Sequence, residues 1–577
     1  MFAALILAVV TAPTPAPAPV LPKIPAVAPG YAAPAVPAAS PHVIGVTQQE
    51  FVGITLDNAV GMALSNDPDL AVVQANRRIA HYQIEAAQGA FDIRLSVQPQ
   101  YQYVTEAPQN AFFAGPNFGP IVQRSASVTA GAQGVTPAGQ QYGVSVAGRQ
   151  TYDNTTINAF NPTYPTVFSV NFSQPLGKNS GITDASRNLL LAQINDRSAA
   201  GHALGVTENT IAQVEDVYWD LVAAWRNAAI QEDALRSTIT QQHSNIRLAN
   251  QGVAAPIDVV QSNTQIAVFQ ENVFSALQRV GALQNQLKSL LSTNPNDPIW
   301  NANLVPTAPV LQLPQEPPLA DLVLTALRNR PEVSEFREQR AAADVNLRYA
   351  QNQTKPQVDL QLGYTSNGFA GTPTNPASSP FFASSAQQLL AINALIAAVN
   401  PTLPPSQQIQ PLPSSNTPVP SYLSGGLNQS IRNLLNNRFP VYSAGVLVSF
   451  PVGNHTAKAN LAIAQEQENI AQVQEASTIQ KITVEVRNAL QAYQSALARL
   501  SAASAARQAA EAVLASEQRR FRAGASTTFL VLQREIEVAN DRGLELQAQT
   551  DLNKAVVEIQ RATGTLLTSG TARPPSP

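Results

Sequence analysis

Hydrophobic residues recur along this chain with two different periods. Strict alternation of apolar and polar residues is typical of a strand with two unlike faces, and it marks four short segments. Spacings of three and four residues are typical of amphipathic helices, and they fill the long segments between the strands. The predicted strands are residues 92–103, 165–174, 357–364 and 441–450. The two periods together predict an α+β chain.

The first predicted strand shows the alternation most clearly. Leu95, Val97 and Tyr101 alternate with Ser96 and Gln98, so one face is apolar and the other is polar. Strands of about 9 to 11 residues with aromatic ends suit a transmembrane barrel, although strands of a soluble sandwich alternate as well. The polar face, which is rich in Gln and Ser, favours a barrel around a watery lumen.

Four strands are too few to close a barrel, for which about 8 is the smallest number. The chain must therefore assemble with other copies of itself. Two copies would supply about 8 strands and little lumen, whereas three copies would supply about 12 strands and an open pore.

Two long segments separate the paired strands, and both are rich in Pro, Asn, Ser, Gly and Thr. They are residues 104–166 and 365–440. Long connections on one side are typical of outer-membrane barrels, in which they lie outside the cell. The first contains a predicted hairpin of Ser125–Ala132 and Tyr142–Arg149, which we interpret as an extracellular extension; additional barrel strands are the alternative. The second contains a predicted short helix over Gln387–Val399.

Two proline-free segments predict unusually long helices, Asp184–Asn250 and Thr456–Arg522. Each would be about 100 Å long at about 1.5 Å per residue, which no compact domain needs. The predicted shorter helices are Pro68–Ala90, Pro256–Leu291, Pro331–Gln353 and Thr527–Ala562. Because two shorter helices placed end to end nearly match one long helix, we expect a bundle in which such pairs accompany each long helix.

The chain contains this layout twice. The segment Leu56–Pro68 returns as Leu319–Pro331, with Leu, Ala, Asn and Pro in register. We assign the two repeats to residues 54–293 and 319–568, joined by a segment at 294–318. A repeat unit of this size predicts a pseudo-symmetric architecture and excludes a short-repeat solenoid.

Composition excludes several classes of protein. Only 13% of residues are charged and none is cysteine, so the chain has no disulfide framework, thiol nucleophile or cysteine-linked lipid anchor. The net charge of -3 gives no signature of nucleic-acid binding. The five histidines lack the spacing of metal ligands, and no nucleophile or phosphate-loop motif occurs. We therefore predict no metal, no cofactor and no enzymatic activity.

The two ends of the chain differ from the rest. Residues 1–18 predict a signal peptide, residues 19–53 a linker rich in Pro and Ala, and residues 569–577 a disordered tail. No later segment has the roughly 20 consecutive apolar residues of a membrane helix. Any membrane span must then be built from strands.

The duplicated strands and long helical hairpins, with the openings Leu56–Pro68 and Leu319–Pro331, resemble the TolC family of outer-membrane efflux channels. The resemblance covers about residues 54 to 568. It implies a homotrimer in the bacterial outer membrane, with a 12-stranded β-barrel that continues into a long periplasmic α-helical barrel. It also implies partners, namely a periplasmic adaptor and, through it, an inner-membrane pump.

The resemblance further implies that the turns between the long helices and their partners face the adaptor. Carried onto this sequence, these turns are the tips of the two helical hairpins. The docking residues are Gly252, Val253, Ala254, Gly524, Ala525 and Ser526. Glycine suits such a turn because it accepts positive φ and lets another backbone approach; simple helix capping explains either glycine equally well, and both roles can hold.

The predicted gate region departs from the family pattern. Asp258 matches one member of the polar links that often hold such channels closed, but the tyrosine and arginine expected opposite it are Phe521 and Ser526. The carboxylates that often ring the entrance are replaced by Leu530 and Gln533. A closed state must therefore rest on other contacts.

Two functions fit these patterns. The first is the outer-membrane channel of a tripartite efflux or type I secretion system, which gives passive passage to delivered substrates. The alternative is a trimeric coiled-coil surface or adhesin-like protein that is anchored by a β-barrel and transports nothing. Such stalks usually have one membrane anchor and no second copy of the strands, whereas this chain has two copies.

Overall fold

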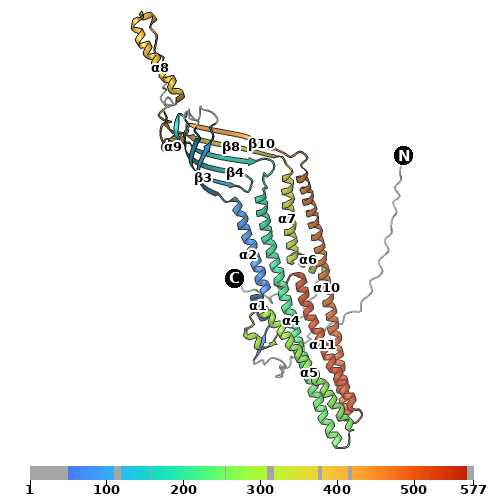
Figure 1. Ribbon diagram of the computed structural model, residues 1–577. Helices are drawn as coiled ribbons and strands as arrows, with labels where there is room; N and C mark the ends of the chain where they lie inside the picture. Colours follow the sequence, from blue (N-terminus) through green and yellow to red (C-terminus); the bar gives the residue numbers. More distant parts are fainter. Residues whose placement is uncertain are drawn as a thin grey trace, which may run out of the picture. The chain divides into compact units, whose positions relative to one another are not determined.

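The computed structural model describes residues 50–108, 119–155, 158–253, 255–307, 318–374, 380–412 and 419–567. The chain divides into two compact units, one helical and one built on a sheet (Figure 1). The helical unit comprises Met1–Asn76, Ala200–Glu335 and Glu475–Pro577, and the sheet unit comprises Arg77–Ala199 and Phe336–Gln474. The predicted signal peptide, residues 19–49 of the predicted linker and the predicted tail lie outside the described residues.

The helices lie where the periodicity predicts them. The two long ones are α4, Asp184–Asn250, and α10, His455–Arg522. Each is accompanied by shorter helices: α2 Pro68–Gln88, α5 Pro256–Leu291, α7 Pro331–Gln353 and α11 Thr528–Thr563. The repeated openings form α1, Leu56–Asn66, and α6, Leu319–Asn329.

Local signals fix several helix ends. The Thr55 side chain accepts a hydrogen bond from Asn58 N at the start of α1, and Thr527 does the same for Leu530 N at the start of α11. Gly564 ends α11 in the left-handed conformation with φ of 66°, which glycine adopts without steric cost.

The helical unit is centred on α4 and a small parallel sheet. Strand β1, Glu50–Ile54, pairs with β7, Ala302–Pro306. Tyr218 Oη donates to Ile54 O at 3.0 Å, and Trp225 Nε1 donates to Leu304 O at 2.9 Å. The core residues of α4 include Ile211, Val214, Tyr218, Leu221, Trp225 and Ala228. The predicted linker 19–53 is therefore too long, because its last residues form β1 against a partner that is distant in sequence.

The sheet unit contains a meander of six antiparallel strands in the order β10-β8-β6-β4-β3-β2 (Figure 1). Two short strands, β5 Phe160–Thr163 and β9 Gly371–Pro373, pair beside this path. The six strands are β2 Arg94–Glu106, β3 Ile121–Val135, β4 Gln141–Asp153, β6 Thr166–Pro175, β8 Gln357–Gly368 and β10 Phe439–Ser449.

The expectation of four strands in the sheet is wrong, and so is the placement of the hairpin outside it. β3 and β4 lie between β2 and β6 as full members of the sheet. Their turn lies beside the connection into α4: Gly181 N donates to Ala138 O at 3.3 Å, and a Cβ on Gly139 would lie 2.5 Å from Asn179 O. The sequence predicted this hairpin but not its place in the sheet, because its apolar face uses small Ala and Gly residues, which weaken the alternation.

The described part of the second long connection contains two α-helices. α8, Pro380–Val399, includes the predicted helix Gln387–Val399 and begins seven residues earlier. α9, Leu427–Leu435, has no counterpart in the prediction. Asn393 and Asn400 of the α8 region hydrogen-bond the backbone of Leu412 and Ile409.

Among the described residues, no helix combines the length and the apolar character needed to cross a bilayer.

The stability of the helical unit should depend on packing along α4 more than on single hydrogen bonds. Leu221→Ala removes a fully buried side chain, so we expect it to cost about 2–5 kcal/mol of unfolding free energy. Tyr218→Phe should cost only about 1 kcal/mol, because Thr307 N still donates to Ile54 O at 3.0 Å. Denaturant unfolding of the detergent-solubilised variants, followed by circular dichroism, measures both, and a larger loss for Tyr218→Phe would contradict this view of the core.

Candidate docking tips and gate region

Two helix-to-helix turns in the helical unit share one backbone geometry. Where α4 ends, Gly252 N donates to Ala249 O at 3.0 Å and Val253 N donates to Leu248 O at 2.9 Å. Where α10 ends, Gly524 N donates to Phe521 O and Ala525 N to Arg520 O, both at 2.9 Å. These paired bonds satisfy carbonyl groups that every helix end leaves free.

Both glycines have φ of +76°, and among the described residues beyond the two chain neighbours, none has an atom within 4 Å of the position that a Cβ would take. Glycine is therefore required by the backbone conformation and not by crowding. The space around each turn is open, and Val253 is 73% exposed. The geometry satisfies helix capping and also leaves a backbone surface that another protein could approach.

The other predicted docking residues differ in their surroundings. Ala525 is exposed, and Ala254 lies outside the described residues. Ser526 is half-buried, and its hydroxyl donates to Glu517, which also forms an ion pair with Arg520 at 3.4 Å. Contacts of Glu517 within the same hairpin thus stabilise the second tip.

Asp258, the first predicted gate residue, caps a helix. Its Oδ2 accepts from Ala255 N at 3.1 Å at the start of α5, which is a favourable place for a carboxylate. Among the described contacts, none joins Asp258 to Phe521 or Ser526. Phe521 and Leu530 are half-buried and Gln533 is exposed.

A buried polar link that the sequence analysis missed joins the two hairpins close to the tips. Asn245 on α4 donates through Nδ2 to Ser262 Oγ on α5 at 2.6 Å, and Thr528 Oγ1 on α11 donates to Asn245 Oδ1 at 3.4 Å. Gln241 Nε2 also donates to Asn245 Oδ1, at 3.0 Å. Asn245 and Ser262 are fully buried, and buried polar groups persist where they are hydrogen-bonded. The sequence contains one signal of this link: Ala224, Thr238 and Asn245, which are all buried, are separated from one another by multiples of seven residues.

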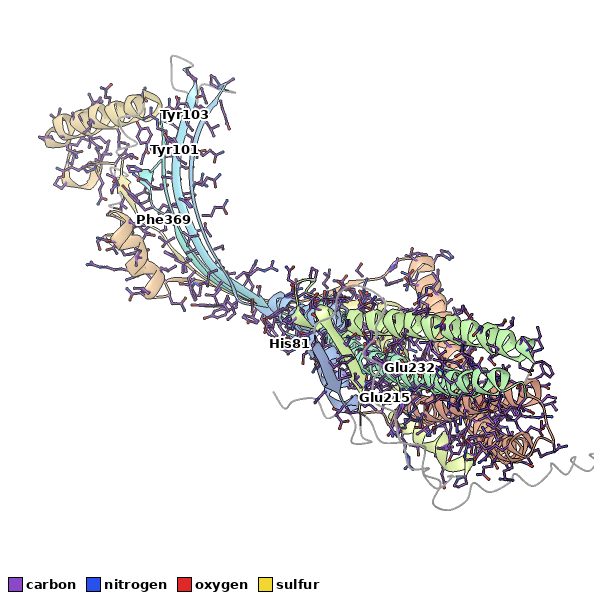
Figure 2. The ribbon with its side chains drawn as sticks, turned by 90° about the horizontal axis from the view of Figure 1, so that it is seen from below. His81, Tyr101, Tyr103, Glu215, Glu232 and Phe369 are labelled. Atoms are coloured by element: carbon purple, nitrogen blue, oxygen red, sulfur yellow. The ribbon has the colours of Figure 1, made fainter. Side chains whose placement is uncertain are left out.

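Three of the buried carboxyl groups in the same unit have a pKa raised to about 7. Burial raises the pKa of Glu535 on α11 to about 7, and burial likewise raises the pKa of Glu215 and of Glu208 on α4 to about 7. Figure 2 shows Glu215 among the helices. Glu535 Oε2 has no hydrogen-bond partner among the described residues. No hydrogen bond to this oxygen therefore offsets the cost of ionising the buried carboxyl group.

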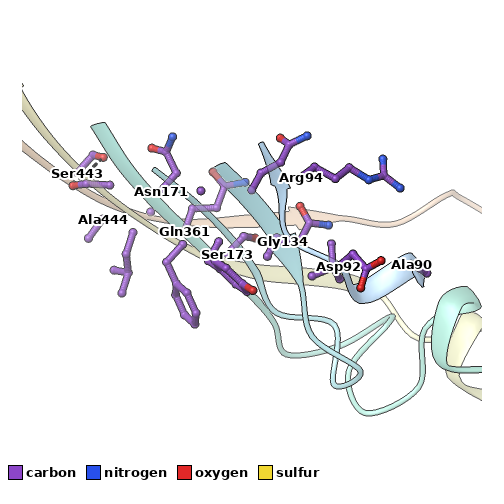
Figure 3. A pocket seen from close by; sticks show the side chains of 18 residues that line it. Ala90, Asp92, Arg94, Gly134, Asn171, Ser173, Gln361, Ser443 and Ala444 are labelled. Atoms are coloured by element: carbon purple, nitrogen blue, oxygen red, sulfur yellow. Dashed lines mark hydrogen bonds between the residues drawn. The ribbon is translucent and has the colours of Figure 1, made fainter. Parts of the chain in front are cut away.

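The sheet unit contains a polar hollow on one face (Figure 3). Residues from all six strands of the meander line it, and the polar side chains among them include Arg94, Asn171, Ser173, Gln361 and Ser443. Across the described residues, no group of three or more His, Asp or Glu is placed to hold a metal ion. The hollow has the chemistry of a water-facing surface.

The comparison with known families gives one match. A family model described as outer membrane efflux protein matches residues 421–565, which contain β10, α10 and α11. No curated protein matches the sequence significantly. The resemblance to this family is confirmed over the matched residues.

Solved channel structures resemble most of the chain. The outer-membrane channel OprN is 16% identical with a TM-score of 0.56, and the match covers 93% of this chain and 99% of that one. CmeC from Campylobacter jejuni is 13% identical (TM-score 0.56; 88% and 85% covered), and the open state of MtrE from Neisseria gonorrhoeae is 15% identical (TM-score 0.55; 90% and 91% covered). These similarities establish the fold, which is that of outer-membrane channel proteins.

The ionisation of Glu535 should make stability depend on pH. A carboxyl group whose pKa is raised from 4.5 to about 7 on folding contributes most to stability below pH 4.5, and this contribution is lost as the pH rises through 7. Glu535→Gln should therefore be more stable than the natural chain by roughly 1–3 kcal/mol at pH 8 and equal to it near pH 4.5.

The measurement is thermal unfolding of the purified protein across this pH range. The control is Glu537→Gln, which changes an exposed carboxyl group on the same helix and should leave the pH profile unaltered. Equal pH profiles for Glu535→Gln and the natural chain would contradict the assignment.

Proposed function

We propose that this chain is the outer-membrane channel of a tripartite efflux or type I secretion system. It gives passive passage to substrates that an inner-membrane pump and a periplasmic adaptor deliver. The observation that supports this proposal most directly is the pair of glycine turns, which have the same geometry in both repeats and open space around them.

The sheet supports the assembly. Its strands β2 and β10 each pair on one side only within the described chain, and unpaired strand edges must be covered or closed. Three copies would close these edges into one barrel in the outer membrane, and the long helices would then line a passage through the periplasm. The polar hollow with Asn171, Gln361 and Ser443 supports a wet lumen.

The tips are the proposed docking surface for the adaptor. Adaptor contact requires an open backbone at both turns, and a bulky charged side chain there would obstruct it. The surroundings of the two tips differ, since Glu517 accepts a hydrogen bond from Ser526 at the second tip.

Glutamate at either tip should abolish export while leaving the channel in the membrane. Gly252→Glu and Gly524→Glu start a charged side chain from a Cβ position that no described residue crowds within 4 Å, so we expect the channel to accommodate it. Because φ is +76°, each also costs about 1–2 kcal/mol of backbone strain. Asparagine tolerates this conformation best among other residues, so Gly252→Asn and Gly524→Asn are matched controls that should export nearly normally.

Export in cells and the amount of assembled protein in outer membranes are measured together. Normal export by both glutamate variants would show that the adaptor docks elsewhere. Loss of export by the asparagine controls as well would trace the defect to the backbone turn instead of the added charge.

The link through Asn245 should hold the hairpins together, since Asp258 is occupied in capping α5. Thr528→Val removes the hydroxyl that joins the hairpins and keeps the shape of the side chain, so we expect the conductance in planar bilayers to rise several-fold. Asp258→Ala should change it little, and Ser262→Ala, which breaks a contact within one hairpin, serves as the control. A large gain from Asp258→Ala with none from Thr528→Val would show that another partner holds the gate.

A further inference from the structure

The six strands of the sheet share one continuous apolar face. Residues that pair across antiparallel strands lie on the same face, and the register sets Val97 opposite Ala130, Ala130 opposite Val146, and Val146 opposite Phe168. In β8 and β10 the same face carries Leu360, Leu362, Tyr442, Ala444 and Val446. The apolar surface therefore runs without a break through the hairpin β3–β4.

The opposite face is polar across the same six strands. Ser96 pairs with Gly131, Gly131 with Ser145, and Ser145 with Ser169. The hydroxyls of Ser145 and Ser169 are hydrogen-bonded at 2.7 Å. The hairpin thus repeats the polar and apolar division of its neighbours.

Large parts of both faces are uncovered in the single chain. Every residue of β10 is exposed, and on β2 Leu95 and Val97 are 80% and 71% exposed. On the hairpin, Val128 is 52% and Val146 is 47% exposed. An apolar face of this extent in water would be an aggregation site, so something apolar must cover it.

Helix α9 covers one end of the apolar face and indicates what kind of molecule covers the rest. It packs on that face near the long connections, with Ser430 Oγ bonded to Thr166 Oγ1 at 2.8 Å and Leu434 O accepting from Ser366 Oγ at 2.8 Å. Its polar Ser430 and Asn433 are fully buried toward the sheet unit, whereas Leu427, Ile431 and Leu435 are exposed.

This arrangement is the reverse of a helix in a soluble protein, which turns its apolar stripe inward. The exposed stripe has a spacing of four residues, as one face of a helix requires. An apolar stripe directed away from the protein fits acyl chains, and it continues the exposed apolar face of the sheet.

Charge supports the same occupant. Across the six strands, Arg124 is the only charged residue with the register of the apolar face, and its guanidinium lies over the Tyr103 ring at 5.6 Å. Figure 2 shows Tyr103 and Tyr101 on β2. Aromatic and basic residues of this kind gather where a bilayer meets water. Between Asp359 and Arg432 the sequence contains no charged residue at all.

We propose that hairpin β3–β4 is part of the membrane wall, so that each copy contributes six strands whose apolar face, together with the outer stripe of α9, contacts lipid acyl chains. The inference rests on the proposed function for its membrane. Three copies then supply about 18 strands instead of about 12, and because diameter grows roughly in proportion to strand number, the barrel is about 1.5 times as wide.

The natural absence of cysteine allows a direct test. Single cysteines are introduced at Thr129 and Val128, adjacent residues on opposite faces of β3, and at Ser169 and Val170 on β6 as the reference pair. The protein in liposomes of phosphatidylcholine is treated with a charged, membrane-impermeant maleimide. We expect Thr129→Cys and Ser169→Cys to react at least about 10 times faster than Val128→Cys and Val170→Cys, because a thiolate is disfavoured in lipid.

A second readout identifies what covers the protected sites. A thiol-reactive, membrane-permeant fluorophore at Val128→Cys, Val170→Cys and Ile431→Cys should be quenched by nitroxide lipids in the bilayer. Protection without quenching at Val128→Cys or Ile431→Cys would show that protein covers that surface and would overturn the proposal.

The outcomes separate this inference from the proposed function. Equal labelling of Thr129→Cys and Val128→Cys, with the reference pair still distinguished, would place the hairpin outside the membrane and refute only the six-stranded wall. Equal labelling within both pairs would show that the sheet does not span a bilayer, and the proposed channel would fail as well.

Discussion

The unsatisfied surfaces of the six-stranded sheet are the constraint on which the rest of the structure depends. Strands β2 and β10 carry rows of backbone donors and acceptors that no described segment pairs. Backbone groups in a bilayer must be satisfied within the protein, so a sheet placed there has to close on itself through other copies. The exposed apolar face indicates that this closure occurs in a membrane, since only lipid or protein can cover Leu95, Val97 and their neighbours.

The helical unit is under a different constraint. It must hold long helices together while leaving the turns at their ends free to contact a partner protein. Packing along α4 around Leu221 and Val280 is continuous and apolar. Near the tips the contacts become polar, with Asn245, Ser262 and Thr528 joining three helices. Apolar packing is non-directional and tolerates little rearrangement, whereas a short hydrogen-bonded link can be exchanged for contacts to a partner. The change from one to the other occurs near the turns at Gly252 and Gly524.

The sequence predicted the helices better than the sheet. Long runs of heptad-like spacing with proline or glycine at the ends predict the bounds of α4, α5 and α7. The helices in the structure have these bounds. Strands β3 and β4 were misplaced because Ala126, Ala130 and Gly148 give little amphipathic signal, and only their pairing shows that they belong to the sheet. The pairing of β1 with β7 also depends on contacts between distant segments.

The candidate site shows the same division. The glycine turns were predictable because positive φ leaves a local mark on the sequence, and both have the geometry that their residues require. The link through Asn245 was not predicted, because a buried amide on a polar-rich helix resembles a solvated one until its partners on α5 and α11 are known. Helix α9 escaped prediction because it is only nine residues long and lies in a connection rich in Pro, Asn, Ser and Gly.

The central claim is that this sheet is complete only when several copies close it in a membrane. The most direct measurement is the native mass of the detergent-extracted protein. Closure by three copies predicts a stable particle with the mass of three chains, each at most 61.2 kDa, which persists on dilution above the critical concentration of the detergent. A stable monomer under the same conditions would contradict the claim, because both edges of the sheet would then remain open.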